Sequence, residues 1–404
     1  MSVRPLEGLK VMDLAWVVAG PLIGRTLADF GACVVRIESS KRVETARLMG
    51  PFPNGKMDVQ QSVLFENCNA NKRGLSLDLS KPEARAVALD LACWADVIIE
   101  SFMPGQMARF GLDYARVQAL NPGVIMLSTA LMGQTGPYAE MSGYGNIGAA
   151  LSGFQMIVGN RGEMPVGPFG PYTDYVGPRF SLVTLLAALD HRQRTGEGCF
   201  IDISQAEAGI EFLAPQIADY CATGRVVEAD GNRDPYFAPH GVYRAAGENA
   251  WVAIVARDDD DWQRLANTVG GPELAADARF KTFQARKANE DALDELIGAW
   301  TANRDAHAIE AQLQVVGVPA HGAAASEDFV HDQHLLARDH FVRLPHPLMG
   351  ESVVEAPRYQ LSETPATFER CAPMFGRDND YVLRELLGYS AERIAALQEG
   401  GALT

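Results

Sequence analysis

One carboxylate at the start of a long predicted helix is the residue of this chain best placed to do chemistry. The stretch TDYVGPRFSLVTLLAALDHRQRTGEG predicts a helix that begins at Thr173 or Asp174 and ends before Gly196. Asp is a favoured N-cap residue, and the positive end of the helix dipole stabilises its ionised form. An ionised carboxylate can attack a carbonyl carbon and form a covalent intermediate. An N-cap aspartate is more commonly structural, so this pattern alone leaves both interpretations open.

Strand-like and helix-like segments alternate along the N-terminal part of the sequence. The expected strands are LKVMDLAWVV, ACVVRIES, RGLSLDLS, VIIESFM and VIMLSTA. Strand followed by helix, repeated several times, predicts an α/β fold with a doubly wound parallel sheet. Such sheets bind ligands beyond the carboxyl ends of their strands, where we expect the loops after Leu14, Glu38, Glu100 and Ser128 to lie.

Three longer segments complete the expected organisation. PGQMARFGLDYARVQAL predicts one helix over residues 104–120. The density of Gly, Pro and Met over residues 131–172 predicts irregular backbone close to a ligand or another chain. The composition changes between Gly224 and Gly231, and the pattern from there to about Val318 predicts a smaller α+β unit.

Several common motifs are missing from the sequence. The turn after the first expected strand reads AWVVAGPLIG, without the G-x-G-x-x-G that a dinucleotide site requires. Neither G-x-x-x-x-G-K-[ST] nor G-x-S-x-G occurs, which disfavours a P-loop enzyme and a hydrolase elbow. The histidines of VHDQHLLARDH have no cluster of further ligands near them in sequence, so we predict no metal.

Composition restricts the partners and the compartment. The 404 residues include 35 Lys and Arg against 51 Asp and Glu, a formal charge of −16, and no basic run interrupts this surplus. A nucleic acid partner is therefore disfavoured. The six cysteines are scattered, as expected for reduced thiols. We find no secretory signal and no apolar stretch of 18 residues, so we expect a cytoplasmic protein with no membrane segment.

Seven segments in one order resemble the class III CoA-transferases, the formyl-CoA and carnitine CoA-transferase family that also contains the 2-methylacyl-CoA racemases. The segments are LEGLKVMDLAWVVAGP, LADFGACVVRIE, NKRGLSLDL, ADVIIESFMPG, LNPGVIMLSTALMGQTGPY, TDYVGPRFSLVTLLAALDHRQRTGEGCFIDISQAE and PRYQLSETP. The resemblance covers nearly the whole chain. It implies a large CoA-binding α/β domain over residues 1–224, a small α+β domain over 225–325 and a C-terminal segment over 326–404 that returns to the large domain. It also implies an interlaced dimer, of two identical chains or of this chain and a paralogue.

In this family the aspartate before the long helix is the nucleophile, and that position is Asp174 here. The resemblance implies a mixed anhydride and then an aspartyl-CoA thioester on Asp174, with CoA thioesters as substrates and no permanently bound cofactor. The histidine that racemase relatives use corresponds to Tyr144, whose phenol has an ordinary pKa near 10, so racemisation is disfavoured. Tyr144 and Asn146 become candidates for shaping the acyl site, and Gly133 to Gly136 for donating N–H groups to oxyanions.

Family positions also indicate where CoA binds. The candidate contacts are Val17, Val18, Lys41, Arg42, Lys72, Arg73, Ser101, Phe102, Met103 and Arg109. Two basic positions usual in the family are Ser39 and Ser80 here, so we expect neighbouring cations to hold the phosphates instead.

Oxalate-specific relatives place a glycine run over the active site, and this chain has GNRDPYFAPHGVY in the matching region. Tyr236 and His240 are therefore expected at the substrate, with Arg233 available for a free carboxylate. This bulky loop favours larger acids, such as succinate or an aromatic-substituted succinate, over formate and oxalate. The alternatives are a non-catalytic partner subunit, against which the carboxylate of Asp174 argues, and a CoA-ester isomerase or racemase.

Overall fold

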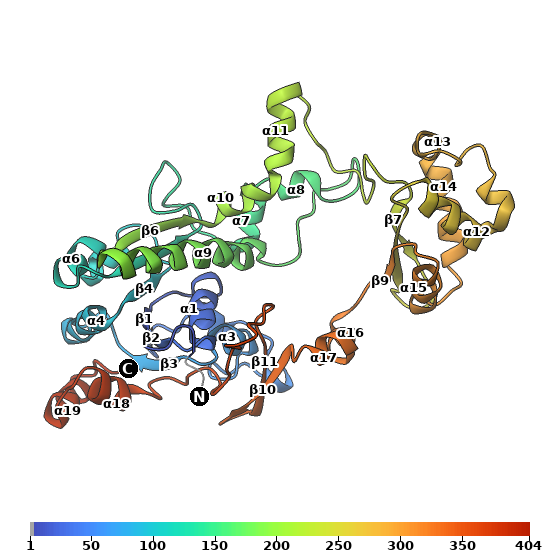
Figure 1. Cartoon of the computed structure of the whole chain (residues 1–404). Coiled ribbons are helices and arrows are strands. Elements are labelled where there is room, and N and C mark those ends of the chain that lie inside the picture. The colour runs from blue at the N-terminus through green and yellow to red at the C-terminus, as the bar shows by residue number, and fades with distance from the viewer. Residues whose placement is uncertain (1–3) are drawn as a thin grey trace. The chain divides into compact units, whose positions relative to one another are not determined.

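Residues 4–404 are described by a computed structural model, in which the chain forms two compact units (Figure 1). The first unit comprises the chain up to Gln155, together with Gly167–Val226 and His334–Thr404. The second comprises Met156–Val166 and Val227–Gln333. Residues 156–166 and 326–333, which lie outside the small domain expected from the sequence, thus group with the second unit.

A six-stranded parallel sheet in the order β3-β2-β1-β4-β5-β6 organises the first unit. Its strands are β1 (Lys10–Asp13), β2 (Cys33–Glu38), β3 (Arg73–Ser76), β4 (Val97–Glu100), β5 (Ile125–Ala130) and β6 (Cys199–Ser204). In the centre of the sheet, Met12 pairs with Val35 of β2 and with Ile98 of β4. The strand order reverses beside β1, so the predicted doubly wound α/β fold is confirmed.

Both faces of this sheet are covered, which explains its runs of apolar strand residues. Met12 and Ile98 belong to one buried cluster, which includes Leu91 of α4 (Pro82–Trp94). Val11 belongs to the opposite cluster, with Leu185 of α9 (Tyr172–Thr195). Successive strand residues therefore feed two separate cores, as the alternation of side chains across a strand requires.

Most helices of the first unit lie on the crossover connections between these strands. They are α1 (Ala19–Asp29), α2 (Thr45–Leu48), the 3-10 turn η1 (Pro53–Gly55), α3 (Val63–Asn69), α4 (Pro82–Trp94), α5 (Gln106–Phe110), α6 (Tyr114–Leu120), α7 (Gly145–Leu151), α9 (Tyr172–Thr195), α10 (Gln205–Ile210), the 3-10 turn η2 (Glu211–Leu213) and α11 (Ala214–Thr223). Short helices α8 (Phe154–Ile157) and α17 (Gln333–Ala337) lie where the chain passes between the units.

Two segments differ from the expectations. The single helix predicted over residues 104–120 is two helices, because Gly111 adopts φ 71° and Asp113 caps the second helix by accepting the Arg116 N–H. Residues 131–172 are not irregular throughout, since they contain α7 and α8.

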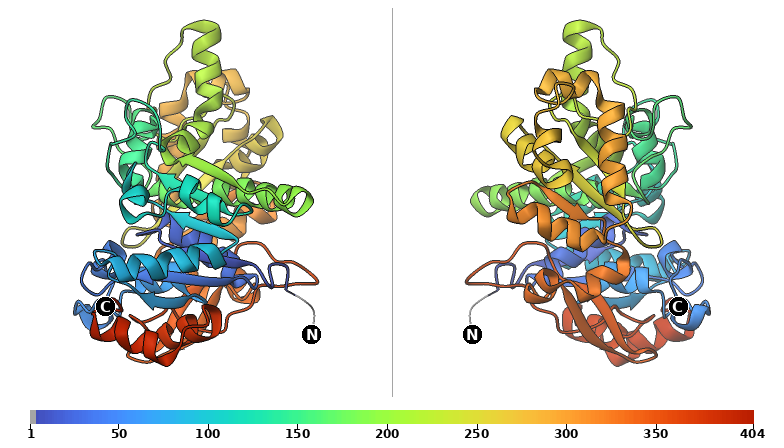
Figure 2. Two further views of the ribbon diagram at one scale, coloured as in Figure 1. Left: turned by 90° about the vertical axis from the view of Figure 1, so that its left-hand side faces the viewer. Right: turned by 90° about the vertical axis from the view of Figure 1, so that its right-hand side faces the viewer.

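The C-terminal stretch returns to the sheet of the first unit (Figure 2). It contains the antiparallel ribbon of β10 (Phe341–His346) and β11 (Gly350–Glu355), followed by α18 (Asn379–Tyr381), the π-helical turn η3 (Val382–Leu386) and α19 (Ala391–Glu399). Val382, Leu383 and Leu397 pack into the same cluster as Met12. Within residues 4–404, no helix is both long and apolar enough to span a membrane.

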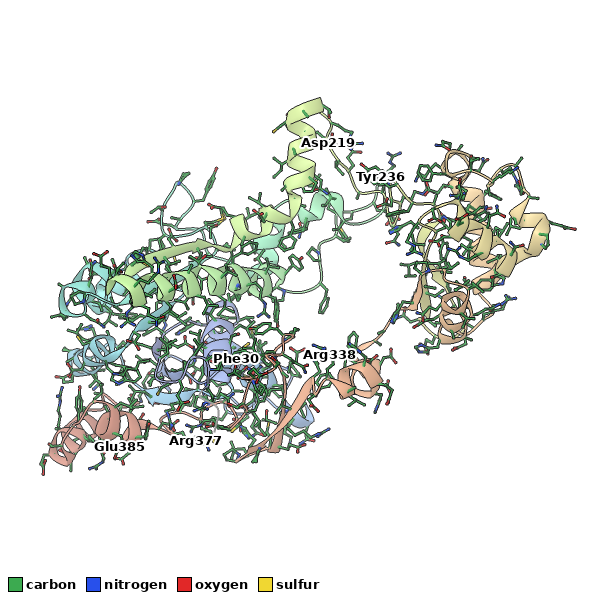
Figure 3. All side chains as sticks on the ribbon, viewed as in Figure 1. Phe30, Asp219, Tyr236, Arg338, Arg377 and Glu385 are labelled. Atoms are coloured by element: carbon green, nitrogen blue, oxygen red, sulfur yellow. The ribbon has the colours of Figure 1, made fainter. Side chains whose placement is uncertain are left out.

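The second unit has a three-stranded antiparallel sheet in the order β7-β8-β9. Its elements are β7 (His240–Arg244), β8 (Trp251–Val255), α12 (Asp259–Ala275), α13 (Phe283–Ala288), α14 (Glu290–Thr301), α15 (Ala306–Val315), β9 (Ala320–Gly322) and α16 (Ser326–His331). Its core forms around Trp262, Phe280 and Leu293, which are fully buried. Tyr236, on the segment before β7, is largely exposed (Figure 3).

Candidate active site

A cavity of about 390 Å³ lies at the carboxyl ends of the central strands of the first unit, where doubly wound sheets bind ligands. Its walls come from the loops after β1 and β4, the end of β5, the segment before α7 and the starts of α9 and α10. They are formed by residues 16–19, Thr45, 101–103, 129–131, Ala139, 141–144, Asp174 and Gln205. Among the described residues, Asp174 is the only carboxylate on this wall, and no lysine or arginine lines it.

Asp174 lies in the first turn of α9 and has only 4% of its surface exposed. The helix begins at Tyr172 with Pro171 as N-cap, so the predicted N-cap role of Asp174 is wrong. The carboxylate instead accepts a hydrogen bond from the backbone of Gly145. Burial raises the pKa of Asp174 to about 6, and this one hydrogen bond opposes the rise only partly. At neutral pH the group is therefore mostly an ionised, poorly solvated carboxylate facing a cavity.

Gly145 allows α7 to approach the start of α9 closely enough to reach this carboxylate. A Cβ atom at Gly145 would lie 2.5 Å from the Pro171 carbonyl oxygen and 2.6 Å from the Asp174 nitrogen. One turn later, a Cβ at Gly148 would overlap the side chain of Thr173. Thr173 Oγ1 donates a hydrogen bond to the Gly145 carbonyl at 3.1 Å, which fixes the two helices together. The spacing of the two glycines is the sequence signal for this contact.

Gly145→Ala is expected to lower kcat by about 100-fold, because the added methyl must displace backbone atoms that position Asp174. The unfolding free energy should fall by about 1–3 kcal/mol. The matched control is Gly298→Ala in α14, where a Cβ meets no atom within 4 Å. Steady-state kinetics and thermal unfolding of both variants check the prediction; normal kcat in Gly145→Ala would contradict it.

A second cavity of about 610 Å³ in the same unit has two cations and two carboxylates on its wall. The cations are Lys41 and Arg42, and Arg42 also lies over the Trp16 ring at 5.3 Å. The carboxylates are Glu38, which pairs with Arg47 at 2.8 Å, and Asp78. Trp16, Phe102 and Met103 line both cavities, so the two are neighbours. Lys41 and Arg42 are therefore candidate partners for the phosphates of a ligand whose reactive group lies in the first cavity.

The structure thus brings together most of the predicted CoA contacts. Val17, Val18 and Ser101 line the first cavity, Lys41 and Arg42 line the second, and Phe102 and Met103 line both. Ser39 and Ser80, which replace basic residues usual in the family, also line the second cavity.

Three predicted cationic contacts lie elsewhere. Lys72 is fully buried, and its Nζ donates to Asp13 Oδ2 at 2.7 Å, to Asn69 Oδ1 at 2.8 Å and to the Pro21 carbonyl at 2.8 Å. With all three protons engaged it cannot hold a phosphate, so its assignment to the CoA site was wrong.

Arg73 lines a separate cavity of about 140 Å³, lies over the Tyr381 ring at 3.9 Å and is 3.8 Å from Asp378. It therefore does not belong to either cavity described above. Arg109 is exposed on α5, and it lines neither cavity although Gln106 and Phe110 of the same helix do.

The predicted substrate contacts divide similarly. Tyr144 lines the first cavity, whereas Asn146 is exposed and lines neither. Gly133 is also absent from both walls, and the Gln134 N–H beside it donates to Asp202 at 2.9 Å, away from the role proposed for that segment. Tyr236 and His240 belong to the second unit, where His240 Nδ1 lies 2.5 Å from the Asn232 carbonyl.

Arg233, also in the second unit, is surrounded by acidic side chains. It pairs with Asp291 and lies 3.8 Å from both Glu290 and Asp294. The charge of Arg233 is already balanced by these carboxylates within its own unit. The prediction that Arg233 is free to pair with a substrate carboxylate is therefore wrong.

Two polar residues of the first cavity were missed by the sequence reasoning. Thr129 at the end of β5 and Gln205 at the start of α10 each have a buried oxygen with no hydrogen-bond partner. Gln205 lies against Gly177, one helical turn after Asp174, where a Cβ would approach Gln205 Cγ to 3.4 Å. Buried polar atoms are normally paired, so unpaired ones on a cavity wall indicate a ligand. Neither residue stands in a motif that sequence inspection would identify.

One buried group resembles a metal site. Glu66, His346 and Cys371 bring potential ligand atoms within 4.8 Å of one another. However, His346 Nδ1 accepts the N–H groups of Leu348 and Met349 at 3.2 and 3.0 Å, which places its proton on Nε2, 3.3 Å from Glu66. A protonated nitrogen is not a ligand, so this group is better explained as a histidine–glutamate pair.

Comparison with known proteins identifies the family of this chain and agrees with its fold. The chain belongs to CoA-transferase family III, whose profile matches residues 6–379, and it is a CoA-transferase. It is 34% identical over 395 residues to the succinyl-CoA–D-citramalate CoA-transferase of Chloroflexus aurantiacus, covering 98% of this chain and 97% of that protein. It is also 34% identical to the alpha subunit of the succinyl-CoA–L-malate CoA-transferase of Chloroflexus aurantiacus, covering 98% and 91%.

The crystal structure of a CaiB/BaiF family protein from Brucella suis superposes with a TM-score of 0.87 at 30% identity, covering 95% of this chain and all of that one. The predicted family is thereby confirmed.

Proposed function

We propose that this CoA-transferase moves CoA from succinyl-CoA to a second dicarboxylic acid, with Asp174 as the covalent nucleophile. The proposal rests on the position of Asp174, a buried carboxylate on the wall of a cavity that adjoins a second cavity lined by Lys41 and Arg42. CoA phosphates would lie beside these two cations in the second cavity, and the thioester would reach Asp174 past Trp16 and Phe102.

The reaction proceeds in four exchanges at the Asp174 carboxylate. An Asp174 oxygen attacks the succinyl thioester carbon, the C–S bond breaks, and a mixed anhydride and CoA thiolate result. The thiolate attacks the aspartyl carbonyl, releasing succinate and leaving an aspartyl-CoA thioester. The incoming carboxylate attacks that thioester, giving a second anhydride and thiolate, and the thiolate then attacks the new acyl carbon. The new CoA ester leaves and the Asp174 carboxylate is restored, so each exchange is an acyl transfer of modest difficulty.

Each exchange passes through an oxyanion, which needs donors at the cavity wall. We assign this role to the hydroxyl group of Thr129, which can donate and has no partner in the free protein, and to the amide NH₂ group of Gln205 on the same wall. They replace the Gly133 segment in this role.

The acceptor is an acid of four or more carbons in this proposal. A cavity of about 390 Å³ has more room than formate or oxalate would fill. The two relatives described above act on D-citramalate and L-malate, which are hydroxy dicarboxylates with four-carbon main chains or longer. A hydroxyl group on the acceptor would suit the unpaired oxygen of Gln205, since that atom can only accept.

The experiment is a transfer assay with an acid panel. Purified protein is incubated with succinyl-CoA and either L-malate, D-citramalate, glutarate, oxalate or formate, and new CoA esters are identified by mass spectrometry. We expect the dicarboxylates of four or more carbons to be converted best. Best use of formate or oxalate would contradict the acceptor assignment, and absence of any new ester would contradict the function in favour of a non-catalytic subunit.

The same assay in deuterated water tests the racemase alternative, because racemisation incorporates solvent deuterium beside the thioester without changing the acid. The presence of Tyr144 where racemases have histidine opposes that outcome.

We also propose that two copies associate, since Val183 and Leu186 on α9 are exposed beside an apolar cavity. Light scattering on the same preparation measures the number of copies, and a monomer would exclude association.

A further inference from the structure

The turn that follows β1 is held by side chains at three successive N–H groups. Ala15 N–H donates to Asp13 Oδ1 at 3.0 Å, Trp16 N–H to Ser101 Oγ at 2.8 Å, and Val17 N–H to Glu44 Oε2 at 3.0 Å. Three acceptors from three different parts of the unit thus fix three residues in a row. Regular structure needs no such tethers, so this turn is held in a conformation that it would not keep alone.

Val17 is the residue under strain in that turn. Its φ of 68° is in the left-handed region, which a β-branched side chain strongly disfavours. Val17 and Val18 line the cavity that holds Asp174, and α1 begins directly afterwards at Ala19. Backbone strain lowers the stability of the fold. A strained residue on a cavity wall therefore indicates that its position there serves the function of the cavity.

Glu44 is well placed to impose this conformation. Its side chain is almost fully buried, and Oε2 also lies 2.7 Å from Arg36 Nη2. Arg36 in turn donates to the Ala15 carbonyl, so both members of the ion pair are hydrogen-bonded to the backbone of the turn, Arg36 at Ala15 and Glu44 at Val17. Burial raises the pKa of Glu44 to about 7, although Arg36 favours its ionised form, so burying this carboxylate is costly. Thr45, the next residue, lines the cavity itself.

We infer that Glu44 is a positioning residue for acyl-CoA, which acts by holding Val17 in its left-handed conformation. The inference rests on the proposed function insofar as the cavity is taken to bind CoA. Glu44 does not itself line the cavity, so its effect passes through the backbone of Val17, which does. Without this tether the turn relaxes to an ordinary φ and moves the wall beside Asp174.

A double-mutant cycle between Glu44 and Val17 tests the inference. Glycine adopts positive φ without strain, so Val17→Gly removes the need for the tether. Glu44→Gln should weaken CoA binding, measured by calorimetry, about tenfold when residue 17 is Val and less than about threefold in the Val17→Gly background. The KM for succinyl-CoA should follow the same pattern, with a smaller change in kcat.

Equal losses in both backgrounds would overturn the inference, because Glu44 would then act only through general stability. Glu44→Asp covers the case in which Glu44→Gln does not fold: it keeps the charge beside Arg36 and shortens the reach to the Val17 N–H. The matched control is Glu66→Gln, since Glu66 is also buried and accepts a backbone N–H, that of Ala372, which is not part of this turn. Its effect on CoA binding should not depend on residue 17.

Calorimetry separates this inference from the proposed function, because CoA binding does not require transfer. A wild-type protein that binds CoA but transfers nothing would contradict the function alone, and the coupling of Glu44 to Val17 could still be measured. A wild-type protein that does not bind CoA would overturn both.

Discussion

Asp174→Asn is expected to lower kcat for CoA transfer by at least about 10⁴-fold, because the variant has no carboxylate to form the anhydride. The amide has nearly the same shape and can still meet Gly145, so the fold and CoA binding should persist. Mass spectrometry of wild-type protein incubated with succinyl-CoA and quenched with hydroxylamine should find the modification on Asp174. Modification of another residue, or substantial transfer by the variant, would contradict the assignment.

The raised pKa of Asp174 adds two further readouts. Because the nucleophile is the ionised form, kcat/KM should fall as the pH falls through about 6. Burial disfavours the ionised form, so this carboxylate costs stability above pH 6, and the cost is absent below its ordinary pKa of 3.8. At pH 7 the unfolding free energy of Asp174→Asn should therefore equal that of the wild type or exceed it by up to about 2 kcal/mol. A marked loss of stability would indicate a structural role instead.

Lys72→Met is expected to lower the unfolding free energy by about 3–5 kcal/mol. The ammonium group lies at the centre of the first unit with no exposed surface and supplies three hydrogen bonds. Methionine fills similar volume but leaves the Asp13 carboxylate, an Asn69 oxygen and the Pro21 carbonyl without this donor. Arg36, 3.4 Å from Asp13, compensates only part of the loss. Denaturant unfolding of the variant gives the value directly.

Lys41→Met is the matched control, because the same side chain is removed from an exposed position on the wall of the second cavity. Its stability should change by less than about 0.5 kcal/mol, whereas the KM for acyl-CoA should rise. If Lys72→Met instead left stability unchanged and raised only the KM, Lys72 would be a CoA contact as the sequence had suggested.

The fold could be predicted because its signals are local. Apolar runs such as KVMD and CVVRIE alternate with helices, and that alternation is enough to specify a doubly wound sheet. The break at Gly111 was missed because a glycine inside a helical pattern can be tolerated or can end the helix, and only the αL conformation decides. The return of the C-terminal stretch depends on distant contacts and was predicted from the family resemblance alone, and the strand order, which also depends on distant contacts, was not predicted.

Part of the candidate site was predictable because its residues follow strand ends. Ser101, Phe102 and Met103 follow β4 directly, and the structure places them on a cavity wall. Lys72 was misplaced because closeness in sequence to a phosphate-binding segment says nothing about which way a side chain points. Thr129 and Gln205 were missed for the opposite reason: their importance depends on lacking partners, a property that only three-dimensional packing defines.

The discontinuous first unit has a consequence for how the protein is made. Its sheet is complete in sequence by Ser204, yet the apolar surface of α4 is covered by Leu383 and Leu397, which are synthesised after the whole of the second unit. At ordinary translation speeds the ribosome needs roughly 10–30 s to make the intervening chain. During that time one of the two hydrophobic clusters of the first unit is incomplete. The first unit can therefore finish folding only after the second unit has been synthesised, and the second unit can fold first.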